Sequence, residues 1–214
     1  LSAAAVQRGA RLVVAWGGDG TINEVASSLV HGPAALGIVR SGSGNSLARE
    51  LGVCARPERA LLDAMAASPR TIDAGEIDGH LFFCVAGIGF DEHIATCFEH
   101  DTSGRRGFAT YVRIAIRELP GYRPRSYKVG DRAVTRAVLV TIANAAQFGN
   151  GARIAPSAKV DDGWLDLVTF DERSRLATVA AVPRLFLGGL ERVAGVTMTK
   201  VERVTIEGDR PIRF

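Results

Sequence analysis

The stretch RLVVAWGGDGTINEVASSLV, residues 11–30, changes its hydrophobic pattern abruptly at a glycine-rich turn. Residues 12–16 form a continuous apolar run, which is typical of a short buried strand. From Ile22 onward the apolar residues recur at the spacing of one face of an amphipathic helix. Thr21 and Glu24 have the spacing of a capping box, which predicts that this helix begins at Thr21. A strand, a Gly-Gly-Asp-Gly turn and a helix in this order indicate one unit of a parallel α/β sheet.

The same pattern recurs directly afterwards. The apolar run at 34–39 leads into RSGSGNSLARELG, residues 40–52, where a second glycine-rich turn precedes another helix. The carboxyl ends of neighbouring parallel strands meet at one edge of a sheet, so the two turns are expected to form one crevice. Free backbone N–H groups at such turns bind phosphate, although a single turn of this kind is also an ordinary connection. Asp19 inside the first turn favours phosphoryl transfer with a metal ion.

After Thr71 the apolar period falls towards two, which is typical of antiparallel strands. Asp78 and Gly79 separate two apolar runs and predict a hairpin. We therefore predict an α/β domain over residues 1–72 and a β-rich domain over residues 73–214. In the second domain the pattern predicts strands at 70–77, 80–88, 125–130, 132–145, 163–170 and 201–208, and helices at 108–119 and 175–189.

Composition narrows the classes of function. The chain has 214 residues and a formal net charge of only +3, which gives no reason to expect nucleic acid as a partner. Its three cysteines form no spaced pair and its four histidines have no metal-binding spacing, which favours reduced thiols in the cytoplasm. No apolar run reaches the roughly 20 residues that span a bilayer. Asp91 and Glu92 are interpreted simply as charges favoured at a helix N-terminus.

The two turns together resemble a known family. VVAWGGDGTINEVASSLV followed by LGIVRSGSGNSLARELG is similar to the catalytic domain of the diacylglycerol kinase family, which includes sphingosine kinases, ceramide kinases and many bacterial lipid kinases. The similarity continues through residues 71–95 and 142–170. It implies a Rossmann-like parallel α/β ATP-binding domain, a β-rich sandwich-like lipid-substrate domain as in NAD kinase-like folds, and a cleft between them. It also implies Mg²⁺-dependent transfer of the ATP γ-phosphate to the hydroxyl of a diacylglycerol-like or sphingoid lipid.

Carried over position by position, the resemblance assigns roles to both turns and to two later segments. Asp19 and Asp73 are implied to be catalytic, with Asp73 at the domain junction. Mg²⁺ is implied at Asp162, with the backbone carbonyls of Lys159 and Trp164; without the resemblance, an Asp-Asp-Gly sequence is more often only a turn. The implied ATP contacts are Gly17, Gly18, Asp19, Gly20, Thr21, Asn23, Glu24, Gly42, Ser43 and Asn45.

Two positions depart from the bacterial pattern, because Arg40 and Ser46 stand where Pro and Asp are frequent. The general base of the family, a Glu in an Asp-Gly-Glu motif, is expected beyond Phe214, and LSAAAVQRGA at the start resembles the end of a helix that begins earlier. Two alternatives stay open. NAD kinases also use a GGDGT loop, and a non-catalytic nucleotide or lipid binder would explain Ser46.

A local excess of basic residues suggests how the chain meets a lipid. Residues 105–128 contain seven basic side chains and a single acid, Glu118. Arg106, Arg113 and Arg117 follow one face of the predicted helix, which predicts peripheral contact with an anionic inner membrane face. A solvated helix face is the competing interpretation. The chain is expected to act as a monomer or homodimer.

Overall fold

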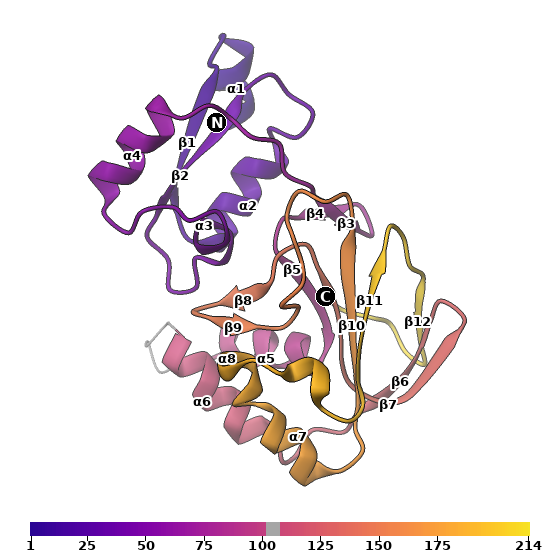
Figure 1. Cartoon of the computed structure of the whole chain (residues 1–214). Coiled ribbons are helices and arrows are strands. Elements are labelled where there is room, and N and C mark those ends of the chain that lie inside the picture. The colour runs from indigo at the N-terminus through magenta and orange to yellow at the C-terminus, as the bar shows by residue number, and fades with distance from the viewer. Residues whose placement is uncertain (102–107) are drawn as a thin grey trace.

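The computed structural model describes residues 1–101 and 108–214 of the chain, with the side chains of 108 and 109 left undescribed. The described residues form two lobes, and the chain passes from the first to the second through residues 67–74, which contain no helix or strand. Figure 1 shows the N-terminal lobe in indigo and magenta above the larger C-terminal lobe.

The first lobe is a parallel α/β unit. Strands β1 (Leu12–Gly17) and β2 (Ala35–Arg40) pair in parallel, and the pairing runs from Leu12 opposite Ala35 to Gly17 opposite Arg40. Ala15, Ile22, Ile38 and Leu47 are buried between the strands and the helices. The parallel arrangement confirms the predicted fold class. The helices are α1 (Ser2–Gln7), α2 (Asp19–Ser27), α3 (Ser46–Glu50) and α4 (Pro57–Ala66).

The second lobe is built on an antiparallel sheet whose central strand is β7 (Arg132–Ala143). One edge of β7 pairs with β10 (Leu165–Asp171), which pairs in turn with β11 (Val196–Val201). The other edge pairs with β6 (Arg125–Val129) along its first half and with β5 (Val85–Gly89) along its second half. β12 (Ile206–Gly208) completes the sheet beside β6.

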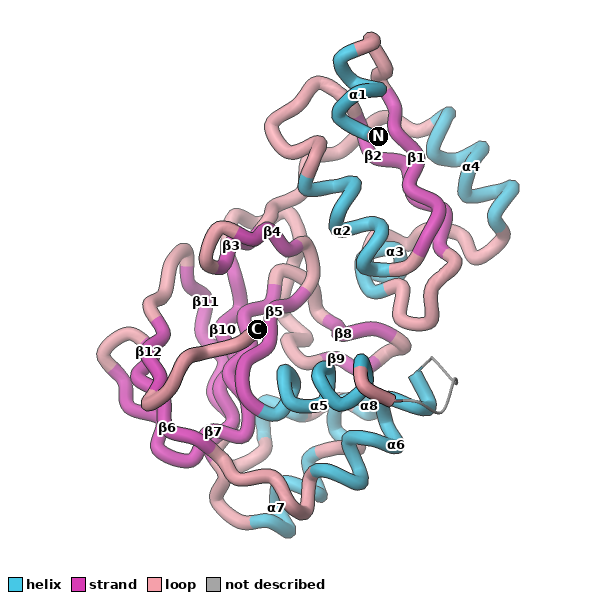
Figure 2. Tube along the Cα trace, turned by 180° about the vertical axis from the view of Figure 1, so that it is seen from behind, coloured by secondary structure: helices cyan, strands magenta, loops and turns pink. Residues whose placement is uncertain are grey.

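Helices cover one face of this sheet, as Figure 2 shows from behind. They pack on a core that contains Ile154, Val168 and Phe170, whereas the opposite face of the sheet buries Ile88, Val134 and Val140. The lobe also has two small hairpins, β3 (Gly75–Ile77) with β4 (His80–Phe82), and β8 (Gln147–Gly149) with β9 (Ala152–Arg153). The helices are α5 (Phe90–Glu99), α6 (Phe108–Glu118), α7 (Arg175–Ala181), α8 (Arg184–Leu187) and the 3₁₀ turn η1 (Leu190–Arg192).

The predicted hairpin at Asp78–Gly79 is confirmed. Both residues have positive φ, 50° and 79°, as a two-residue type I′ turn requires, and they join β3 to β4. Among the residues that the structure describes, no helix has the length and apolar character needed to cross a membrane.

Several predicted boundaries are wrong. Helix α2 begins at Asp19, two residues before Thr21, because extended Gly18 takes the N-cap position and the Thr21 side chain lies over Gly17 instead of capping the helix. The predicted helix at 175–189 divides into α7 and α8 at Pro183, which has no N–H for a helical hydrogen bond. The predicted strands at 80–88 and 201–208 each contain a break, and the hydrophobic pattern did not predict β8, β9 or a separate β11.

Candidate functional site

The two glycine-rich turns lie in direct backbone contact at the carboxyl ends of β1 and β2. A Cβ atom at Gly42 would lie 2.5 Å from the Cα of Gly18, and one at Gly18 would lie 3.1 Å from the Cα of Gly42. Neither position has room for a side chain without movement of the opposite backbone. The turns therefore form the single crevice that the sequence predicts.

Asn45 fixes the shape of the second turn. Its backbone is left-handed, with φ 51° and ψ 47°, and it takes the N-cap position of α3. Its side-chain oxygen accepts a hydrogen bond from Gly42 N at 2.9 Å, and its amide nitrogen donates to Gly42 O at 2.5 Å. Gly42 is thus held against Gly18 by a side chain that is itself buried. Asn45 therefore shapes the crevice by holding the backbone of Gly42 with its side chain.

Asp19 connects the two turns. It is the first residue of α2, and its Oδ1 accepts a hydrogen bond from Ser46 N, at the start of α3, at 2.5 Å. Its Oδ2 lies so close to Gly44 that a Cβ there would be 2.6 Å away. The carboxylate therefore belongs to both turns, which places a negative charge in the middle of the crevice.

The second lobe closes one side of the crevice through the β8–β9 hairpin. The hydroxyl of Ser46 donates to the carbonyl of Phe148, and Asn150 Nδ2 donates to the carbonyl of Ser43 at 2.8 Å. Gly149, with φ 133°, packs against Gly44. The crevice is therefore a junction between the lobes. Ser46, the position that departs from the bacterial pattern, is one of the residues that ties them together.

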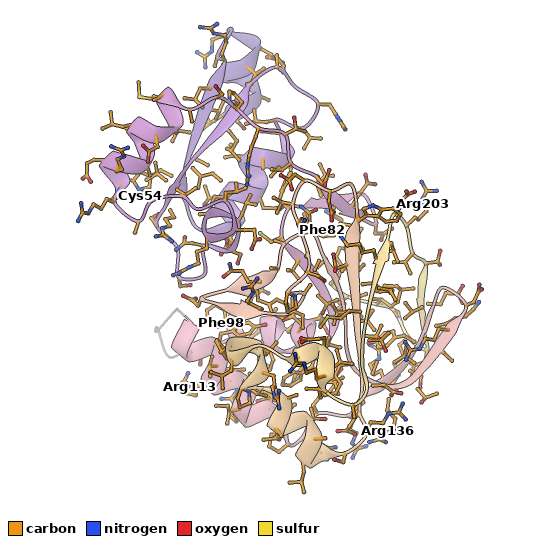
Figure 3. The ribbon with its side chains drawn as sticks, in the orientation of Figure 1. Cys54, Phe82, Phe98, Arg113, Arg136 and Arg203 are labelled. Atoms are coloured by element: carbon orange, nitrogen blue, oxygen red, sulfur yellow. The ribbon has the colours of Figure 1, made fainter. Side chains whose placement is uncertain are left out.

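A cavity of about 480 Å³ leads from Asp19, Ser43 and Gly44 into the second lobe. It lies between the sheet and helices α5 to α8, and its walls are mostly apolar. Figure 3 labels Phe98, whose side chain belongs to this wall. The apolar wall includes Phe90, Ile94, Phe98, Leu119, Phe148, Phe170 and Leu185.

One carboxyl group lies inside this apolar wall. Asp91 and Tyr111 both line the cavity, and the Tyr111 hydroxyl donates to Asp91 Oδ1 at 2.7 Å. Burial raises the pKa of Asp91 above its ordinary value, although the Tyr111 hydrogen bond opposes the shift. Gly87 leaves the space, because a Cβ there would collide with the Asp91 carboxylate. Asp91 stands in the first turn of α5, as the sequence predicts for a helix-terminal charge, and it also lines the cavity.

The two other acids predicted for the site, Asp73 and Asp162, lie in a second group at the junction between the lobes. Asp73 Oδ2 accepts a hydrogen bond from Gly163 N at 2.8 Å, so the junction acid contacts the predicted metal turn, 90 residues away in the sequence. Asp73 N donates to Val160 O at 2.6 Å, and Asn144 Nδ2 donates to Asp73 O at 2.9 Å. Asn144 N in turn bonds to Cys84 O. Burial, and then the carboxylates of Asp19 and Glu50, raise the pKa of the Cys84 thiol.

The turn at 159–164 has oxygen donors that suit a hard cation. Asp162 Oδ1 accepts from Trp164 N at 3.1 Å, and Lys200 donates to Asp162 Oδ2, which lowers the pKa of Asp162. Lys200 Nζ is also 3.9 Å from Asp166 Oδ2, a buried oxygen without a hydrogen-bond partner among the described residues. Two carboxylates that share one ammonium group fit a cation site of the Mg²⁺ type, in which Lys200 would have to yield.

Some predicted ATP contacts have other partners. Asn23 Nδ2 donates to Leu81 O at 3.1 Å and so joins α2 to β4. The Thr21 side chain packs over Gly17, and Glu24 is exposed on α2. Gly20 has open space around its Cα. Of the first turn, Gly18 therefore forms the crevice with its backbone and Asp19 with its carboxylate, whereas Asn23 supports the junction between the lobes.

Comparison with known proteins decides the family. Residues 84–214 match the family model of the YegS C-terminal NAD kinase beta sandwich-like domain, and residues 1–77 match that of the diacylglycerol kinase catalytic domain. The chain belongs to the diacylglycerol kinase family of lipid kinases. The resemblance seen in the two turns is thereby confirmed, and so is the two-part fold class.

Among curated members of this family, a YegS-like lipid kinase of Chromohalobacter salexigens is 32% identical over 176 residues, which are 78% of this chain and 56% of that protein. A diacylglycerol kinase of Mycobacterium tuberculosis is 29% identical over 221 residues, covering 97% of this chain and 70% of that protein. The chain thus spans little more than half of the first relative. The crystal structure of a diacylglycerol kinase from Bacillus anthracis superposes with a TM-score of 0.67 at 21% identity, covering 98% of this chain and 71% of that one, and it shares the fold.

Proposed function

We propose that the protein containing this lipid kinase chain transfers the γ-phosphate of ATP to a lipid hydroxyl. The observation that carries the proposal is the continuity between the glycine crevice and the apolar cavity, because Asp19, Ser43 and Gly44 line both. ATP held at the crevice would place its γ-phosphate next to the hydroxyl of a lipid whose hydrocarbon chain fills the cavity. Phosphoryl transfer needs little beyond such positioning and charge stabilisation.

The chain itself supplies four parts of this reaction. Backbone N–H groups of the glycine turns would donate hydrogen bonds to phosphate oxygens, apart from those of Gly42 and Ser46, which already donate to Asn45 and Asp19. Asp19 lies where the donor and the acceptor hydroxyl meet, and it orients the hydroxyl or accepts its proton. Helices α5 to α8 exclude water from the acceptor. Asp91 with Tyr111 gives the acceptor one polar partner inside the cavity.

We propose Mg²⁺ as the metal ion, held by Asp162 with the backbone carbonyls of Lys159 and Trp164, next to Asp73. The shared ammonium of Lys200 on Asp162 and Asp166 supports this assignment, since it marks a place where the protein already stabilises a cation. When bound, Mg²⁺ neutralises negative charge on the phosphates during transfer. Without the ion, the Lys200 ammonium balances the negative charge of the Asp162 and Asp166 carboxylates.

The cavity argues against NAD as the acceptor. NAD is polar along its whole length, whereas the walls that lead away from Asp19 consist mainly of Phe, Leu, Ile and Val side chains. A hydrocarbon chain gains free energy when it leaves water for such walls, by about 0.8 kcal/mol for each CH₂ group. The apolar walls therefore support a lipid acceptor over a dinucleotide.

The first test is an acceptor panel. The full-length protein is incubated with γ-labelled ATP and Mg²⁺, and with diacylglycerol, sphingosine, ceramide or NAD in separate reactions. We expect label in a lipid and none in NAD, because the acceptor site is apolar. Label in NAD alone would overturn the proposal, and ATP binding without label in any acceptor would support a non-catalytic homologue.

We further propose that the lipid is reached at an anionic membrane surface. Of the predicted patch, Arg106 lies outside the described residues, while Arg113 pairs with Asp101 at 3.1 Å and Arg117 with Glu118 at 2.9 Å. Helices α7 and α8 add apolar side chains that face solvent, Leu176 and Leu187, which are 85% and 84% exposed. Apolar and basic groups on one surface are typical of membrane contact.

Vesicle sedimentation tests the membrane contact. Replacing Arg106, Arg113 and Arg117 by Gln is expected to weaken binding to phosphatidylserine vesicles, since each basic residue contributes about 1 kcal/mol near an anionic leaflet. The matched control replaces Arg8, Arg11 and Arg59, which are exposed on the first lobe, by Gln. If both triple variants sediment like the parent, these arginines are not the membrane contact.

A further inference from the structure

A group of side chains outside the cleft has the composition of a transition-metal site. His93 and Cys97 stand one turn apart on α5, so their side chains lie on the same face of the helix. Glu118 reaches them from the last residue of α6. One ligand atom from each residue lies within 4.8 Å of the other two, the only such group with three members among the described residues. The sequence gives no warning of it, because Glu118 is 21 residues beyond Cys97.

The distances within the group suit a tetrahedral ion. His93 Nε2 is 3.1 Å from Glu118 Oε2 and 3.8 Å from Cys97 Sγ. Zinc bonds of about 2.0–2.1 Å to nitrogen, 2.0–2.2 Å to oxygen and 2.3 Å to sulfur place neighbouring ligand atoms of a tetrahedron roughly 3.3–3.6 Å apart. Each of the two distances differs from this range by only a few tenths of an ångström. The third pair, Cys97 Sγ and Glu118 Oε2, lies within 4.8 Å, so binding requires the thiol and the carboxylate to close on the ion by side-chain rotation.

An ion pair between His93 and Glu118 accounts for part of the arrangement. It leaves the position of Cys97 unexplained, because a thiol contributes little to a carboxylate–imidazole pair. The other Glu118 oxygen accepts from Arg117 Nε at 2.9 Å, which fixes the carboxylate with Oε2 towards His93.

We propose that His93 Nε2, Cys97 Sγ and Glu118 Oε2 bind one Zn²⁺-type ion. The side chains of His93 and Glu118 are 39% and 27% exposed, so solvent can supply a fourth ligand. Binding replaces the S–H bond of Cys97 by an S–metal bond and releases the proton to water. The mixture of imidazole, thiolate and carboxylate suits Zn²⁺ and excludes Mg²⁺, which prefers oxygen ligands. The site is therefore separate in place and in chemistry from the proposed Mg²⁺ turn.

The position of the site gives it a structural consequence. Ile94 and Phe98 of α5 line the apolar cavity, as do Ala115 and Leu119 at the end of α6. A bound ion would join these two helices on the side that faces away from the cavity, and so fix the spacing of its wall. Metal binding at this site depends neither on ATP nor on a lipid, so it can be tested without the kinase reaction.

Cobalt spectroscopy tests the proposal on the full-length protein. Co²⁺ replaces Zn²⁺ in tetrahedral sites, and a thiolate ligand gives a near-ultraviolet charge-transfer band. We expect one equivalent of Co²⁺ to produce this band together with visible d–d bands, and one equivalent of Zn²⁺ to remove them. Because the ion binds the folded state, Zn²⁺ should also raise the thermal midpoint.

Matched variants locate the ion. Cys97→Ser keeps the His93–Glu118 pair and should lose the charge-transfer band and weaken Zn²⁺ binding at least roughly tenfold. Cys54→Ser should leave the charge-transfer band and the Zn²⁺ affinity unchanged, because Cys54 lies in the first lobe. Cys97 lies in the second lobe, next to Phe98 (Figure 3). A parent protein without the band, or a Cys97→Ser variant that retains it, would overturn the proposal. Metal-free melting of each variant shows whether it is folded.

Discussion

Replacing Asp19 by Asn should lower phosphoryl transfer at least roughly 10²-fold, the scale of a lost acid–base or charge-stabilising group. The fold should survive the change. The carboxylate accepts a hydrogen bond from Ser46 N, and an Asn side-chain oxygen accepts it equally well. We therefore expect the thermal midpoint to stay within a few degrees of the parent. Steady-state transfer and thermal melting of the same preparation measure the two effects.

Asp78→Asn is the matched control for this change. Asp78 also carries one negative charge, but it is located in the turn between β3 and β4, where its positive φ of 50° is well tolerated by Asn. The turnover of the Asp78→Asn variant should equal that of the parent. A fully active Asp19→Asn variant would remove Asp19 from the reaction, and an unfolded one would show that its role is structural.

Gly42→Ala should separate the two glycine turns. The added methyl carbon would lie 2.5 Å from the Cα of Gly18, a backbone atom that cannot move away as the end of a flexible side chain could. We expect a loss of about 1–3 kcal/mol in the free energy of unfolding, as for other overpacked positions. ATP affinity should fall as well, because the N–H groups of the two turns would no longer point to one phosphate. Urea unfolding and nucleotide titration measure the two quantities.

Gly20→Ala is the matched control for stability. Gly20 lies two residues from Gly18, yet a Cβ there meets no atom within 4 Å, and Ala is favoured over Gly in a helix. The free energy of unfolding should therefore stay level or rise slightly. Equal stability of the two Ala variants would mean that the turns are not packed as described.

The fold and the crevice were predictable because their signals are local. Gly17 to Gly20 and Gly42 to Asn45 each follow an apolar strand directly, and neighbouring parallel strands bring such turns together. The hairpin at Asp78–Gly79 is equally local. The start of α2 was wrong by two residues because Gly18 caps the helix without a side chain, which no side-chain pattern reveals.

Contacts between distant segments could not be predicted in the same way. Ser46 bonds to Phe148, 102 residues later, so its role in joining the lobes has no sequence signature. Asp91 has the sequence position of an ordinary helix-terminal charge. Its contact with Tyr111 at the cavity depends on the tertiary structure. Asp73 was expected at the junction from the family resemblance, but its contact with Gly163 depends on how the chain returns to that place. The roles assigned to Asp19, Asp73 and Asp162 remain predictions until they are measured.

Phosphoryl transfer by an Ala95→Trp variant tests most directly whether the apolar cavity beside Asp19 holds the acceptor. Ala95 lines the cavity but is exposed, so an indole can occupy the space without disturbing a packed core. With γ-labelled ATP and the best lipid of the acceptor panel, we expect transfer to fall at least roughly tenfold through a misplaced or excluded acceptor. ATP affinity should be unchanged. Ala66→Trp, on the exposed side of α4, should behave like the parent. Unaltered lipid phosphorylation by the folded Ala95→Trp variant would contradict the account.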